Sequence, residues 1–137
     1  MQEPAASGGK YVCVYNKTRE KFVATHATVA EGYLSRLVGL LGTTRRWARP
    51  GKGLWILPSH GVHTIGMLYA LDLIFLDRNH VVVSVEEHVR PFRISKVSFK
   101  ADSVLELPVH TVFRTETRVG DQLEISRVRT HDSTVST

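Results

Sequence analysis

The chain has 137 residues, of which 42% are hydrophobic and 23% are charged, proportions that indicate a globular protein and exclude a disordered one. A chain of this length forms one domain and buries roughly two thirds of its unfolded surface, so folding requires neither a disulfide nor a metal. The formal net charge is +5, and the lack of an apolar run of about 18 residues excludes a membrane-spanning helix. The single cysteine, Cys13, has no disulfide partner, and we expect a buried, inert thiol.

Both ends of the chain are predicted to be flexible tails. Residues 1–10 are small and polar and residues 127–137 are rich in Ser and Thr, which leaves a single globular domain over residues 11–126. The N-terminus lacks the apolar core of a signal peptide, so the sequence as given indicates a cytoplasmic protein. If a leader has been removed, the same sequence suits a secreted or periplasmic protein.

The first part of the domain predicts a hairpin followed by a helix. Residues 11–16 and 21–25 have strand-like alternation around a polar turn at residues 17–20. Thr28 and Glu31 have the spacing of a capping box, which predicts that a helix begins there. Its apolar stripe consists of Leu34, Leu37, Val38 and Leu41, with Gly42 as the stop.

The most apolar part of the chain runs from Gly53 to Val85. Within it, residues 71–76 are all apolar except Asp72, so both faces of a strand formed here would be apolar. This predicts a strand inside the sheet with both faces buried. Residues 77–80, Asp-Arg-Asn-His, have the composition of a hairpin turn, and the next strand follows over residues 81–89.

Further strands are predicted at residues 54–57 and 62–67, which precede this pair, and at residues 103–107 and 122–126, which follow it. Residues 91–100 are predicted to be a loop with an edge segment. Pro108 is expected to open a short helix that carries Val109, Val112 and Phe113, and residues 119–121 are predicted to form a turn. The fold class is therefore α+β, mainly β, with an amphipathic helix near the N-terminus and a short helix near the C-terminus.

Several motifs occur in one order between Thr28 and Ser126. They are LSRLVGLLG, GLWILP, the His63-Thr-x-Gly-Met67 element, the Leu71-Asp72 pair, VLELP and VGDQLEI. These motifs and their order resemble those of domain of unknown function family 192, also called uncharacterised protein family 0127. The resemblance implies a compact, curled, mostly antiparallel, barrel-like sheet and no established activity. Relatives often have Pro-Cys where this chain has Pro58-Ser59, so thiol chemistry at that corner would be absent here. Ala70 and Val109-His110 are further departures.

Basic residues gather in two segments of the chain. One set is Arg45, Arg46, Arg49 and Lys52, and the other is Arg90, Arg93, Lys96 and Lys100. Each set is either an ordinary solvated surface or a patch that faces an anion. Trp47 and Phe92 could stack on bases, but no nucleic-acid-binding motif accompanies them, so we expect no nucleic-acid partner.

Asp72 needs partners, because a carboxylate in a strand that is apolar on both faces is costly to bury unless it is hydrogen-bonded. His63, Thr64 and Tyr69 are the nearest polar side chains in sequence, and Arg46 or Arg49 could also reach it. A structural network is favoured. The alternative is a hydrolase-like triad with Ser59, which the missing G-x-S-x-G motif makes weak.

Other polar and aromatic side chains have an ordinary interpretation and a functional one. His60 and His63 would point to opposite faces of an extended strand, so no metal site is predicted. Glu106 alternates with Leu105 and Leu107, which places it on an exposed face. Trp55 either packs in the core or forms a wall on which a ligand stacks.

We therefore predict a non-catalytic binding or accessory module with a polar rim around residues 58–72. The residues assigned to binding are Trp55, Ser59, His60, His63, Thr64, Met67 and Asp72, with Arg45, Arg46, Arg49 and Lys52 as an anion patch. The alternative is a small hydrolase-like enzyme that uses His63 and Asp72. The expected partner is a small ligand or a protein, the expected state is a monomer or weak dimer, and no cofactor is predicted.

Overall fold

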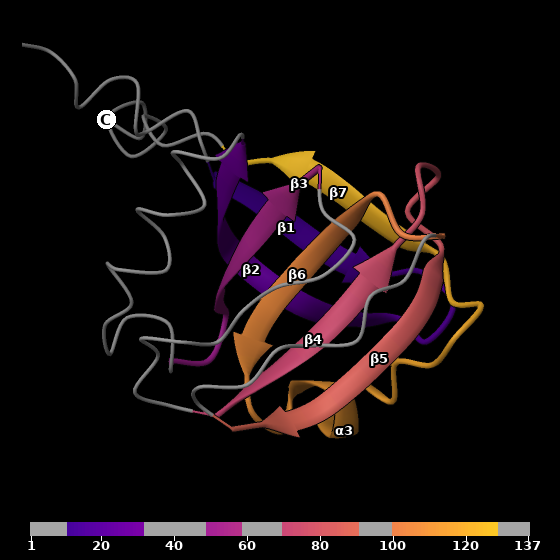
Figure 1. The fold of residues 1–137 in the computed structure, drawn as a ribbon. Coiled ribbons are helices and arrows are strands. Elements are labelled where there is room, and N and C mark those ends of the chain that lie inside the picture. The colour runs from indigo at the N-terminus through magenta and orange to yellow at the C-terminus, as the bar shows by residue number, and fades with distance from the viewer. Residues whose placement is uncertain (1–10, 32–48, 59–69, 91–99, 129–137) are drawn as a thin grey trace, which may run out of the picture.

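The computed structural model describes residues 11–31, 49–58, 70–90 and 100–128. The elements in these ranges are β1 (Tyr11–Asn16), β2 (Lys21–Glu31), β3 (Lys52–Leu57), β4 (Leu71–Leu76), β5 (Val82–Val89), β6 (Ser103–Pro108), α3 (Thr111–Thr115) and β7 (Leu123–Arg127). The strands form one sheet in the order β5-β4-β6-β3-β2-β1-β7. Neighbouring strands are antiparallel except β2 and β3, which are parallel. The predicted mainly β class and mostly antiparallel sheet are confirmed (Figure 1).

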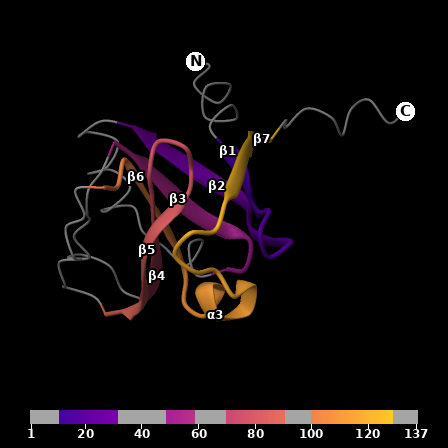
Figure 2. The same ribbon diagram turned by 90° about the vertical axis from the view of Figure 1, so that its right-hand side faces the viewer.

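The sheet curls into a half-barrel, so that its two edge strands approach each other at one end. Val81, just before β5, forms a bridge with Gln122, just before β7. The N–H of Leu123 donates to the carbonyl of His80 at 3.0 Å, and the N–H of Val82 donates to the carbonyl of Asp121 at 2.9 Å. Figure 2 shows the curved sheet from the side, with α3 below it. The curl that the family resemblance implied is therefore present.

Strand β4 is buried along its whole length, as its two-sided apolar sequence predicts. Ile74 and Leu76 pack inside the curl with residues from β1, β2, β5, β6 and β7. Leu73 and Phe75 point to the opposite face, where they pack with residues of β3 and β6. The alternation of strand side chains thus supplies two apolar clusters from a single strand.

One end of the curl carries α3, and Asp72 attaches that helix to the sheet. Oδ1 of Asp72 accepts the N–H of His88 at 2.9 Å, and Oδ2 accepts the N–H of Val112 at 2.9 Å. The first N–H groups of a helix have no partner within the helix, and the residue before α3, His110, provides no side-chain cap. The carboxylate of Asp72, from strand β4, therefore caps the N-terminus of α3 in place of a local side chain.

The expected helix start at Thr28 is wrong. Thr28 and Glu31 lie in β2, where residues 26–31 pair in parallel register with residues 52–57 of β3. The segment contains Thr and Val, which favour strands, and the ladder with β3 satisfies the backbone groups that a cap would otherwise serve. The expected helix body over residues 34–41 lies outside the described residues. Within those residues α3 is the only helix, and it begins at Thr111 rather than at Pro108, which ends β6.

A buried polar network joins the turn after β1 to the turn before β7. Nδ2 of Asn16 donates to Oγ1 of Thr117 at 3.1 Å and to Oδ2 of Asp121 at 3.0 Å, and Nε of Arg19 donates to the same carboxylate oxygen at 3.0 Å. Burial alone would raise the pKa of Asp121, but the hydrogen bonds from Arg19, Asn16 and the N–H of Arg118 lower it below its ordinary value. Asp121 is therefore held as a carboxylate at this edge of the sheet.

Cys13 is partly buried rather than fully buried, because it is one of the less buried positions in the alternating strand β1. Burial, with a smaller contribution from the negative charge of Glu124, raises the pKa of the thiol. A raised pKa keeps the sulfur protonated near neutral pH, where a thiol is a poor nucleophile.

Candidate functional site

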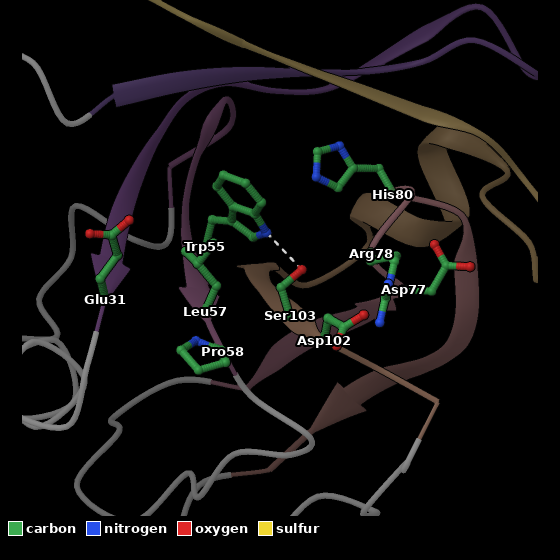
Figure 3. A pocket seen from close by; sticks show the side chains of 9 residues that line it. All are labelled: Glu31, Trp55, Leu57, Pro58, Asp77, Arg78, His80, Asp102 and Ser103. Atoms are coloured by element: carbon green, nitrogen blue, oxygen red, sulfur yellow. Dashed lines mark hydrogen bonds between the residues drawn. The ribbon is translucent and has the colours of Figure 1, made fainter.

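A pocket lies at the end of the curl opposite α3. The strand register fixes this position, because Ser103 at the start of β6 pairs with Leu76 at the end of β4, whereas Pro108 pairs with Leu71 at the α3 end. The pocket has a volume of about 360 Å³, within the range of roughly 300–1,000 Å³ that small-molecule sites occupy. The described residues that line it are Glu31, Trp55, Leu57, Pro58, Asp77, Arg78, His80, Asp102 and Ser103 (Figure 3).

Trp55 is held in one orientation within this pocket. Its indole Nε1–H donates to Oγ of Ser103 at 2.9 Å, and part of the ring packs against the apolar cluster inside the curl. Ser103 is 3% exposed, and among the described residues its own hydroxyl hydrogen has no acceptor. The pocket thus combines a fixed aromatic ring with a buried hydroxyl that has unused hydrogen-bonding capacity.

The turn between β4 and β5 places His80 against the Trp55 ring. Oδ1 of Asp77 accepts the N–H groups of Asn79 at 2.8 Å and of Val81 at 3.0 Å, which is the local bonding that Asp provides in turns. His80 has a positive φ of 64°. Its ring lies edge-on to the indole with 5.5 Å between centroids. The hairpin turn predicted for residues 77–80 is confirmed, and it forms one wall of the pocket.

Carboxylates stand on both sides of the Trp55 and Ser103 pair. Glu31, at the end of β2, lies on one side, and Asp77 and Asp102 lie on the other (Figure 3). Glu31 and Asp102 are exposed, and neither carboxylate makes a hydrogen bond or ion pair with any described residue. Arg78 is the one basic residue of fixed charge among the lining residues that the structure describes.

The residues assigned to binding from the sequence are only partly covered by the structure. Trp55 lines the pocket, as does Pro58 from the predicted rim. Ser59, His60, His63, Thr64 and Met67 lie outside the described residues, as do Arg45 and Arg46 of the anion patch. Arg49 is exposed, and Lys52 begins β3 at the end away from the pocket. The anion patch and the contribution of residues 59–67 stay hypotheses.

Asp72 is buried and has partners, as its sequence context required, but it does not line the pocket. It lies near the start of β4, at the α3 end, and its two oxygens accept backbone N–H groups rather than bonds from the side chains that were considered. His63 lies outside the described residues, so the pairing of His63 with Asp72 is untested.

Glu106 was expected to be exposed, and this is wrong. It is 3% exposed on β6, where it lies opposite Leu54 of β3 and Leu73 of β4, and no side-chain hydrogen bond to it occurs among the described residues. Alternation places a residue on a face but does not show whether that face is open to water. Burial raises the pKa of Glu106 to about 8, so its carboxyl group is mainly neutral at pH 7.

Most residues of the pocket were not assigned to it from the sequence. Those missed are Glu31, Leu57, Asp77, Arg78, His80, Asp102 and Ser103. The composition of residues 77–80 did identify a turn, but nothing local shows that this turn, the end of β2 and the start of β6 meet around Trp55. Among the described residues, no group of three or more His, Cys, Asp or Glu side chains could hold a metal ion. Nor does the described part of the chain contain a helix long and apolar enough to cross a membrane.

Residues 14–125 match the family DUF192, described as an uncharacterised ACR. The chain is 29% identical over 115 residues to a UPF0127 protein of Thermococcus sibiricus, a match that covers 80% of this chain and 71% of that protein. It is 27% identical over 118 residues to a UPF0127 protein of Pyrococcus furiosus, covering 82% of this chain and 97% of that protein.

Two solved structures have a similar fold. A protein of unknown function from Novosphingobium aromaticivorans has a TM-score of 0.66 at 18% identity and covers 83% of each chain. A candidate transcription regulator from Sinorhizobium meliloti has a TM-score of 0.67 at 21% identity and covers 84% of this chain and 92% of that chain. At these identities the likeness concerns the fold alone.

Proposed function

We propose that this chain, which belongs to the DUF192 family of uncharacterised proteins, is a non-catalytic binding module. Its ligand site is the pocket beside Trp55. The observation that carries this proposal is the orientation of Trp55. A hydrogen bond to a buried serine holds the indole in a pocket of about 360 Å³. A ring fixed before binding loses little conformational freedom when a ligand arrives, which favours affinity.

The contacts of the polar side chains support binding rather than catalysis. A serine nucleophile needs a general base within hydrogen-bond reach. Among the described residues, the hydroxyl of Ser103 is bonded to the Trp55 indole and not to a histidine. Asp72, the acid of the hydrolase alternative, has both oxygens committed to backbone N–H groups.

A second hollow, beside α3, offers less to a small ligand. It has a volume of about 610 Å³ and includes Phe113 and Val119 in its lining. These two side chains are 78% and 63% exposed, so much of the apolar lining is open to water, although Val112 beside them is buried. Small-molecule sites are lined mainly by apolar and aromatic side chains with a few polar groups, and the Trp55 pocket has the more apolar lining of the two together with a fixed aromatic ring.

The proposal predicts that compounds from a chemically diverse library raise the melting temperature of the parent protein and fail to do so when the pocket is filled. Asp102→Trp introduces a large ring at an exposed position of the lining and leaves the core unchanged. Glu87→Trp places the same ring at an exposed position beside the second hollow and serves as the control. Thermal-shift screening of the three proteins in parallel measures the effect.

Compounds that stabilise the parent and Glu87→Trp, but not Asp102→Trp, are the expected result. If the hits act equally on Asp102→Trp, the pocket beside Trp55 is not the ligand site, and a library without any stabilising compound counts against the proposal.

A further inference from the structure

We infer that the pocket beside Trp55 takes a small cationic ligand, with an ammonium or guanidinium group on a short apolar body. This inference rests on the proposed function and specifies the chemical class of the ligand.

The charges around the pocket are opposite in sign to those of the chain as a whole. Among the lining residues that the structure describes, three carry a carboxylate, Glu31, Asp77 and Asp102, and one carries a guanidinium, Arg78, whereas the formal charge of the whole chain is +5. A site lined by one sign of charge concentrates ligands of the opposite sign. The described part of the lining therefore has a net negative charge, which favours a cationic ligand.

The carboxylates that flank the pocket are available to a ligand. Glu31 and Asp102 are exposed and unpaired among the described residues. Asp77 uses one oxygen to accept two backbone N–H groups of its own turn, and no described residue donates to its other oxygen. Glu31 is the last residue of β2, Asp77 follows β4 and Asp102 precedes β6. In the sheet order β3, which carries Trp55, lies between β6 and β2. A ligand over Trp55 thus has carboxylates on both sides.

Two groups inside the pocket, the Trp55 ring and the Ser103 hydroxyl, can also bind an amine. An ammonium or guanidinium group near an aromatic ring is attracted by the electrons of the ring face, an effect that is largest for Trp. The hydroxyl of Ser103 receives the indole N–H with one lone pair and retains a second acceptor site for an N–H donor. Ser103 is 3% exposed, so this acceptor lies at the buried end of the pocket. The acidic rim and the ring favour the same ligand class, whereas the Ser103 hydroxyl, which can both accept and donate, can serve a cationic ligand as an acceptor but does not select for it.

Three probes of equal length separate the cationic class from the alternatives: 1,5-diaminopentane, 1,5-pentanediol and glutarate. Isothermal titration at low ionic strength is expected to give saturable binding of the diamine, weaker or no binding of the diol, and none of the dianion. Added salt is expected to weaken diamine binding, because the rim charges are exposed to screening.

Substitutions on the rim test the role of the carboxylates. Glu31→Gln and Asp102→Asn are each expected to weaken diamine binding roughly two- to fivefold, the range for solvent-exposed charge pairs. Glu87→Gln removes a carboxylate from an exposed position of β5 outside this pocket and is expected to leave affinity unchanged.

The possible failures are distinguishable. Binding of the diol or of glutarate as tight as that of the diamine overturns the cationic class and leaves the binding function standing. The same holds if the diamine fails to bind while compounds from the thermal-shift screen occupy the pocket. Absence of any pocket ligand in both experiments overturns the proposed function together with the inference.

Discussion

Replacement of Asp72 by Ala is expected to lower the free energy of unfolding by about 2–4 kcal/mol. The carboxylate accepts the N–H groups of His88 and Val112, and both bonds are lost in the variant. The Val112 donor is buried, and leaving it without a partner costs about 1–3 kcal/mol, whereas the bond from His88 is only partly buried and contributes about 1 kcal/mol. The loss also detaches the first turn of α3 from β4, so the helix and the sheet weaken together. Urea denaturation of parent and variant under identical conditions measures the difference.

Asp72→Asn is the informative companion to Asp72→Ala. Asn keeps one acceptor oxygen but presents an NH₂ group to the other backbone donor, so stability is expected to fall, by no more than in the Ala variant. Glu124→Ala, at an exposed position of β7, is the control for loss of a carboxylate and is expected to change little. Asp72 variants as stable as the parent would remove its structural role and return it to the functional candidates.

Replacement of Glu106 by Gln is expected to stabilise the protein at alkaline pH. The parent loses stability between pH 5 and pH 8, and the variant is expected to show little of this loss. The folded-state pKa of Glu106 is about 8, against an ordinary value of 4.5. The unfolded chain therefore releases this proton at a lower pH than the folded protein does. Because the folded state holds more protons throughout this window, the stability of the parent falls as pH rises from about 4.5 to about 8.

The expected size follows from the conversion of about 1.4 kcal/mol per pKa unit, which gives a loss of about 3–4 kcal/mol between pH 5 and pH 8. Gln has the shape of the neutral acid and does not titrate, so Glu106→Gln should match the parent more closely at pH 5 and exceed it at pH 8. Unfolding curves at the two pH values measure the contrast, with Glu124→Gln as the exposed control. A difference between parent and variant that does not depend on pH would show that Glu106 does not titrate as a buried acid.

The sequence predicted the parts of the fold that local patterns determine. Strand β4 followed from its two-sided apolar sequence, and the turn at residues 77–80 followed from Asp and Asn, whose local bonding the structure contains. The expected helix start at Thr28 failed because pairing with β3 outweighed a local capping motif. The exposed position expected for Glu106 failed because alternation does not reveal that both faces of β6 are covered.

The pocket could not be predicted from local sequence patterns, because its residues come from distant parts of the chain. Trp55 was considered as a ligand-stacking wall, but its partner Ser103 is 48 residues away in the chain, and His80 comes from a third segment. Only the register of β3, β4 and β6 brings these side chains together. A buried apolar strand predicts that a core exists, whereas the site depends on which strand ends meet.

The position of the ligand site is tested most directly through the Trp55 side chain. Its indole N–H gives a separate signal in a ¹H–¹⁵N correlation spectrum, which the Trp55→Phe variant assigns. The protein is titrated with the compounds that raise its melting temperature. Binding in the pocket predicts a saturable shift of the Trp55 indole signal together with the amides of Asn79, His80 and Ser103. Shifts confined to residues 113–119 beside α3, with the Trp55 signal unchanged, would contradict it.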